Sequence, residues 1–155
     1  MKSGKYGPGN TNFDKLKVKR LPLHFYNAVD YSKAGCGACS LSLLTGDNPF
    51  AIATKVKKGN FTDSFMKKYL RKHGISVYEV NKANLTRNSE WKHSLQDNHV
   101  VLFSAIVRKK DSSWFLAYNQ NVLFHNFEVI KADFYTLLSF PITSAFVLYK
   151  KEWAE

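Results

Sequence analysis

The sequence has few cysteines and no long apolar run, and each shortage excludes a class of protein. Only two of the 155 residues are cysteine, Cys36 and Cys39, too few for a scaffold held by disulfides. A zinc site would need further ligands nearby, but the five histidines are scattered along the chain. The longest apolar run, residues 100–107, is far too short to span a membrane, and the first residues lack the apolar core of a signal peptide. We therefore expect a cytoplasmic protein with free thiols, no cofactor and no membrane span.

Acidic residues are also scarce relative to basic ones. Asp and Glu total 12 against 23 Lys and Arg, which gives a formal net charge of +11 at pH 7. Such an excess predicts a surface that meets nucleic acid, an anionic envelope or an acidic substrate. With 45% hydrophobic and 15% aromatic residues, the chain is too apolar to be disordered, and its length suits one domain.

Residues 1–20 are predicted to form a flexible basic arm, and residues 21–155 a single domain. The arm starts with glycine and polar residues and holds six Lys or Arg against one Asp. Either the arm is a solvated tail, or it and a basic helix face contact nucleic acid phosphates. The candidate contacts are Lys15, Lys17, Lys19, Arg20, Lys67, Lys68 and Arg71.

Hydrophobic periodicity predicts helices in the first half of the domain and strands in the second. Residues 36–44 are compact and apolar and end before Gly46, as a buried helix does. Residues 60–73 have one apolar and one basic helical face, and residues 50–57 suit a short helix. Strands are predicted over 75–80, 99–107, 114–118, 122–127 and 144–149, a polar helix or loop over 83–96, and a helical turn over 134–138. This order predicts an α+β domain with helices packed on an antiparallel sheet.

Cys36 is the candidate nucleophile because it follows a glycine and opens an apolar helix. The partial positive charge and free amides of a helix N-terminus favour a thiolate there. Cys39 lies one turn further along, and we expect it to point into the core.

A nucleophilic thiol also needs a base and a group that orients the base. His99 begins the strongest predicted strand, and Asn119 follows the end of the next one. In an antiparallel pair the start of one strand lies beside the end of the next, so the two residues are expected to be neighbours. Cys36, His99 and Asn119 thus form a candidate triad in this chain order.

Two motifs resemble papain-like cysteine peptidases, and most closely the double-glycine leader peptidases. The first is Leu21-Pro-Leu-His-Phe-Tyr-Asn27 followed by Cys36-Gly-Ala-Cys-Ser-Leu41, and the second is His99-Val-Val-Leu-Phe with Trp114-Phe-Leu-Ala-Tyr-Asn119. The resemblance covers roughly residues 21–121. It implies a papain-like fold, with the Cys on N-terminal helices and the His and Asn on a C-terminal antiparallel sheet. It also implies that Cys36 is the nucleophile, His99 the general base and Asn119 its orienter.

The family's oxyanion-hole Gln corresponds to Asn27, which with the amide of Cys36 would stabilise the oxyanion. Asp30 is the alternative occupant of that position, but a carboxylate would repel an oxyanion. The function that follows is a thiol hydrolase that cleaves a peptide or isopeptide bond.

Two other functions fit the same sequence. One is a non-catalytic protein with this fold that binds nucleic acid or a protein partner through its basic surface. Its small size and basic charge also suit a phage protein associated with the virion. The other is a cell-wall amidase or endopeptidase of the CHAP type, which carries Cys and His in a similar order and acts on an anionic wall.

Overall fold

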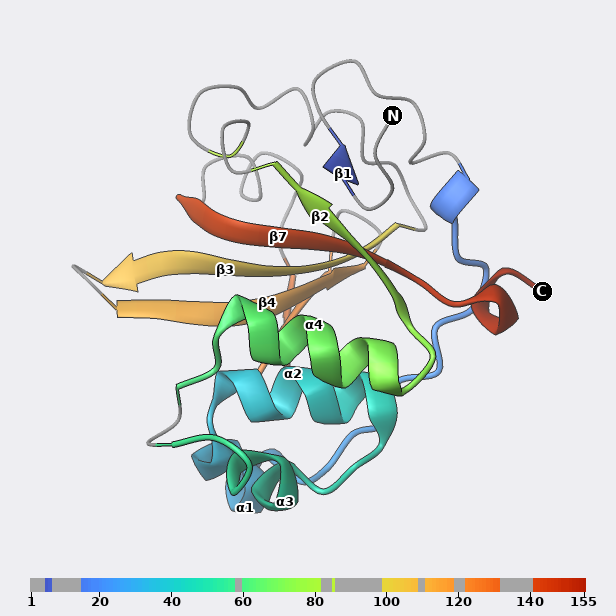
Figure 1. Ribbon diagram of the computed structural model, residues 1–155. Coiled ribbons are helices and arrows are strands. Elements are labelled where there is room, and N and C mark those ends of the chain that lie inside the picture. The colour runs from blue at the N-terminus through green and yellow to red at the C-terminus, as the bar shows by residue number, and fades with distance from the viewer. Residues whose placement is uncertain are drawn as a thin grey trace.

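The computed structural model describes residues 5–6, 15–57, 60–81, 85, 99–108, 111–118, 122–131 and 141–155. In this part of the chain a seven-stranded sheet carries the helices on one face (Figure 1). Most of the helices precede most of the strands along the chain, so the predicted α+β class is confirmed. The predicted turn at 134–138, and the predicted segment at 83–96 apart from Leu85, lie outside the described residues.

The helices begin and end where the sequence supplies caps. They are α1 (Ala28–Tyr31), η2 (Ser32–Ala34), α2 (Cys36–Thr45), α3 (Pro49–Ala53), α4 (Asp63–Lys72) and η3 (Lys151–Ala154). Gly46 ends α2 in the left-handed region at φ 84°, as the sequence predicted, because a residue without Cβ adopts that conformation without strain. The side chain of Asn48 caps α3, and Pro49 occupies its first turn.

Helix α4 has the amphipathic character that its sequence predicted. Met66, Tyr69 and Leu70 are buried, and the side chain of Thr62 caps the helix by accepting a hydrogen bond from the Phe65 amide at 3.1 Å. Arg71 and Lys72 lie in the last turn, where positive charge is favourable to the helix dipole.

The strands run in the order β1-β2-β7-β3-β4-β5-β6 across the sheet, and every pair except β1 with β2 is antiparallel. They are β1 (Lys5–Tyr6), β2 (Ser76–Val80), β3 (Val100–Arg108), β4 (Asp111–Tyr118), β5 (Val122–His125), β6 (Glu128–Lys131) and β7 (Ile142–Tyr149). The strand predicted over 122–127 is in fact a hairpin that turns at Asn126 and Phe127, both with positive φ. Such turns normally carry glycine at the second position, and Phe127 in its place hid the turn from the sequence analysis.

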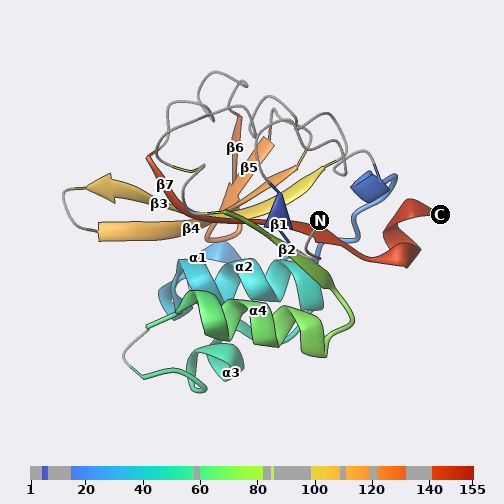
Figure 2. The same ribbon diagram turned by 45° about the horizontal axis from the view of Figure 1, so that its top comes forward.

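The two faces of the sheet bury different clusters of side chains. Val100, Leu102, Leu116, Phe146 and Leu148 pack against the helices. Their neighbours along the strands point to the opposite face, where Leu16 and Leu85 pack against them. Figure 2 shows the helices together below the sheet. None of the helices in the described ranges has the length and apolar character needed to cross a bilayer.

The described part of the predicted basic arm is packed against the domain. Leu16 and Val18 are buried, while Lys15, Lys17 and Lys19 between and beside them are exposed. The amides of Lys19 and Arg20 both donate to the carbonyl of Trp153, at 2.8 and 3.0 Å. Residues 15–20 therefore belong to the packed structure, and their lysines are exposed on its surface.

Candidate functional site

Cys36 opens helix α2, and its thiol reaches the middle of the sheet. The side chain is half-buried, and its Sγ accepts a hydrogen bond from the backbone amide of Trp114 in β4 at 3.2 Å. The indole of Trp114 in turn donates to the carbonyl of Phe61 at 3.2 Å. The sulfur of Cys36 therefore lies at a helix N-terminus and against a backbone N–H of the sheet.

Gly37 lies directly against an aromatic ring. A Cβ at this position would come within 2.5 Å of the Cγ of Phe61, which is closer than real Cβ atoms approach a neighbour. Only glycine therefore fits between Cys36 and the core at this point. The first turn of α2 is fixed by its fit against Phe61 and by the contact of Cys36 with Trp114.

Cys39 is fully buried one turn further along α2, as the sequence predicted. Its Sγ donates to the carbonyl of Tyr31 at 3.6 Å. Burial, with a smaller contribution from nearby Cys36, raises the pKa of Cys39 to about 12. The two thiols therefore differ sharply in their access to solvent.

Asn27, the candidate oxyanion donor, caps helix α1. Its side-chain oxygen accepts a hydrogen bond from the amide of Val29 at 2.8 Å, and the residue is exposed. The observed role of this side chain is therefore to begin a helix.

His99 is buried at the start of β3. Its distance from Cys36 follows from the register of β3 against β4. Trp114, which contacts Cys36, pairs with Ser104, five residues after His99. At about 3.3 Å per residue, His99 lies about 16 Å along β3 from this contact. Val100, the next residue, packs with the helices, so the alternation of side chains directs His99 toward the other face. The structure does not bring Cys36 and His99 together, and Asn119 lies outside the described residues.

Three other histidines are described, and their contacts place them elsewhere. The ring of His24 lies against Gly46, at the far end of α2 from Cys36. His73 pairs with Asp47 in the same region. His125 stacks on Phe115 with ring centroids 4.8 Å apart, and burial lowers its pKa.

Asp47, Tyr69 and His73 form a polar cluster that the sequence analysis did not single out. Asp47 accepts hydrogen bonds from the Tyr69 hydroxyl and from Nε2 of His73, the latter at 2.9 Å, while Nδ1 of His73 faces the carbonyl of Tyr69 at 2.9 Å. The pKa of Asp47 is lowered, and the hydrogen bond from Tyr69 is the main cause. His73 and Lys55 act in the same direction. Tyr69 and His73 lie 22 and 26 positions after Asp47 in the sequence, so no local motif indicates the cluster. It ties the end of α2 to the end of α4.

The basic residues predicted on α4 divide into two groups. Lys67 is half-buried and pairs with Glu79 at 2.8 Å, with its amino group above the ring of Phe146. Lys68 and Arg71 are exposed, and Arg71 also donates to the carbonyl of Val77. Lys67 thus faces the sheet, and the outward positive surface of the helix begins at Lys68.

The fold is similar to that of a known structure. The chain is similar to the crystal structure of the peptidase domain of Streptococcus ComA, a bi-functional ABC transporter involved in a quorum-sensing pathway. The TM-score is 0.55 at 15% sequence identity, over 85% of this chain and 100% of that one. No protein-family model matches the chain, and no curated protein matches it. The likeness supports the sequence-based resemblance to cysteine peptidases at the level of the fold.

The described residues contain no group of three or more His, Cys, Asp or Glu placed to hold a metal ion.

Proposed function

We propose that this protein is a papain-like thiol hydrolase that cleaves a peptide bond, with Cys36 as its nucleophile. The observation that carries the proposal is the position of Cys36 at the N-terminus of α2, half-exposed and hydrogen-bonded by the Trp114 amide, within a peptidase-type fold. Nucleophilic cysteines of hydrolases are found in such positions, partly exposed at the start of a helix.

In the mechanism we propose, the thiolate of Cys36 adds to the substrate carbonyl, and the amide of Cys36 and Asn27 stabilise the oxyanion. A base takes the thiol proton and passes it to the leaving amine, and water then hydrolyses the thioester; the sequence predicts His99, oriented by Asn119, for this role. The start of β3 is paired with both β4 and β7 and lies about 16 Å along the strand from the Cys36 contact, so the role of His99 stays a prediction that the experiment below tests.

The test is digestion of a peptide library, with products read by mass spectrometry. We expect cleavage by the wild type and at least a hundredfold slower cleavage by Cys36→Ser, because the hydroxyl is a far weaker nucleophile than the thiolate. Cys39→Ala is the matched control and should cleave like the wild type. Loss of cleavage in His99→Ala would show that His99 serves Cys36 during the reaction, and unimpaired cleavage would assign the base elsewhere. An inactive wild type would overturn the proposal.

The separation of His99 from Cys36 favours a second candidate, a non-catalytic protein of this fold that binds nucleic acid. A shallow groove of about 580 Å³ runs along the outer side of α4. It is lined by Phe65 and Tyr69 and by four cations, with no acidic residue among its lining side chains: Lys55, Lys68, Arg71 and Lys72. Cations around aromatic rings are the features that bind single-stranded nucleic acid.

Neighbouring lysines provide a matched test of this candidate. We expect Lys68→Gln to weaken binding of a single-stranded DNA oligonucleotide several-fold at low salt and to make its salt dependence less steep, because a phosphate contact is lost. Lys67→Gln should change the affinity less than about twofold, because Lys67 faces Glu79 and Phe146. Equal effects of the two substitutions, or no binding to DNA at low salt, would contradict this candidate.

A further inference from the structure

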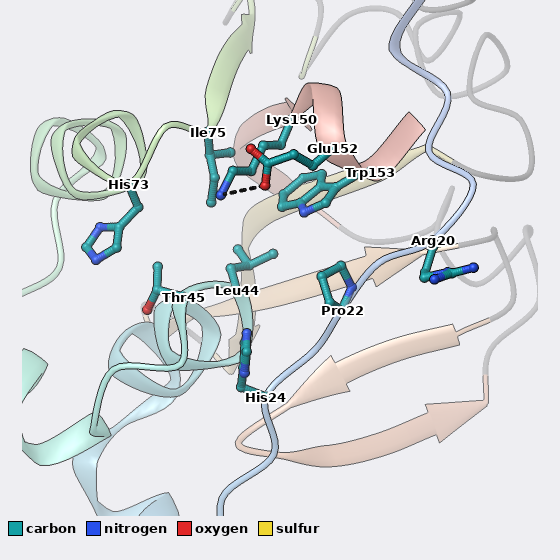
Figure 3. Close-up of a pocket in the computed structure, with 10 residues that line it drawn as sticks. All are labelled: Arg20, Pro22, His24, Leu44, Thr45, His73, Ile75, Lys150, Glu152 and Trp153. Carbon is teal, nitrogen blue, oxygen red and sulfur yellow. Dashed lines mark ion pairs between the residues drawn. The ribbon is translucent and has the colours of Figure 1, made fainter. Parts of the chain in front are cut away.

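A separate cavity of about 190 Å³ lies at the C-terminal end of α2, shown in Figure 3. Cys36 opens the same helix, whose ten residues span about 15 Å. The cavity therefore lies at the far end of this helix from the candidate nucleophile, and its chemistry can be considered independently.

The inner wall of the cavity is apolar. It is formed by Leu44 at the end of α2, Ile75 before β2 and Trp153 in η3, which are 6%, 2% and 4% exposed. Figure 3 shows these three side chains close together at the centre of the view. A ligand in this cavity would place an apolar group against them.

The rim of the cavity carries an excess of positive charge. Arg20 and Lys150 line it with a single acid, Glu152, which approaches Lys150 at 3.5 Å and whose side chain is 74% exposed; the rings of His24 and His73 are also part of the lining. Within the described residues, the guanidinium of Arg20 and the ring of His24 make no hydrogen bond or ion pair. An exposed ion pair of this length is weak, so a competing anion can displace Glu152 from Lys150.

The walls of the cavity are held in place by backbone hydrogen bonds. The amide of Arg20 donates to the carbonyl of Trp153 at 3.0 Å, and the amide of His24 to the carbonyl of Leu43 at 2.9 Å. The amide of Ile75 donates to the carbonyl of Leu70 at 3.0 Å. A cavity whose walls are fixed in this way binds without first being ordered.

We propose that this cavity binds a small organic carboxylate with an apolar body. The body lies against Leu44, Ile75 and Trp153, and the carboxylate meets the amino group of Lys150 at the rim. A cavity of about 190 Å³ holds the volume of about six waters, which limits the body to one ring or a short branched chain.

The test is an NMR titration of the full chain with benzoate, which is flat and anionic, and with benzamide, which has the same shape but no charge. We expect benzoate to shift the backbone amide signals of Ile75 and Trp153. It should bind at least about tenfold more tightly than benzamide, because the uncharged benzamide cannot form an ion pair at the rim. Lys150→Met should weaken the binding of benzoate at least about tenfold. Glu152→Gln should strengthen it about threefold, because the competing carboxylate is removed.

Lys33→Met serves as the control, because Lys33 is exposed in η2 at the other end of α2 and should leave benzoate binding unchanged. The opposite signs predicted for Lys150→Met and Glu152→Gln separate a loss of binding from a loss of folding. Equal affinities for benzoate and benzamide, no effect of either rim substitution, or no shift at Ile75 and Trp153 would each overturn the proposal.

Discussion

At about pH 8, iodoacetamide should alkylate Cys36 at least a hundredfold faster than Cys39. Burial raises the pKa of Cys39 to about 12, so only about one molecule in 10,000 carries that thiolate at this pH. Cys39 is also closed to solvent, whereas Cys36 is half-exposed at the start of its helix. Peptide mapping by mass spectrometry after timed quenching gives both rates from one sample.

The pH dependence of the slow reaction provides an internal check. The folded-state pKa of Cys39 lies above its ordinary value of 9.0, so its alkylation should rise about tenfold per pH unit until the pH approaches 12. In concentrated guanidinium chloride the two rates should converge, because unfolding removes the burial. Similar rates for the two thiols in the folded protein would contradict the assigned burial and the proposed nucleophile together.

Gly37→Ala should destabilise the protein by about 1–3 kcal/mol, the usual cost of inserting a methyl group into a packed core. The added Cβ would lie within 2.5 to 2.8 Å of three carbons of Phe61, one of which is Cβ and cannot move without the backbone. For a chain of this length, thermal unfolding should shift downward by several degrees. Differential scanning calorimetry measures the change.

The source of this cost can be isolated with a double-mutant cycle. In a Phe61→Ala background the alanine at position 37 meets open space, so its penalty should largely disappear. Ser40→Ala, on the next turn of the same helix, removes a buried hydroxyl that has no hydrogen-bond partner among the described residues, and it should not destabilise the protein. If the cost of Gly37→Ala were the same in both backgrounds, the contact with Phe61 would not be its cause.

The local features of the fold could be predicted from the sequence because local chemistry determines them. Gly46 ends α2, Asn48 and Pro49 begin α3, and the continuous apolar run in β7 reflects its two buried faces. The hairpin at Asn126 was missed because its turn lacks the usual glycine.

The placement of α2 on the sheet could not be predicted in the same way. Every residue from Gly37 to Leu44 is buried, so the helix has no polar face to fix its rotation or its direction along the strands. The sequence therefore predicts that Cys36 begins a helix and that His99 begins a strand. It does not predict at which end of the strands the helix begins, because long-range packing decides this. The contact of Cys36 with Trp114 sets that end, and it is not the end at which β3 starts.

The carbonyl of Trp153, which accepts from the amides of Lys19 and Arg20, has a consequence for the order in which the protein folds. These residues lie near opposite ends of the sequence, so their contact closes a loop of almost the whole chain. During synthesis the segment around Lys19 leaves the ribosome early. Its hydrogen bonds to Trp153 can form only after Trp153 has also left the ribosome. The cavity beside Trp153 is therefore completed last, after the hairpins and helices, whose contacts are local, have formed.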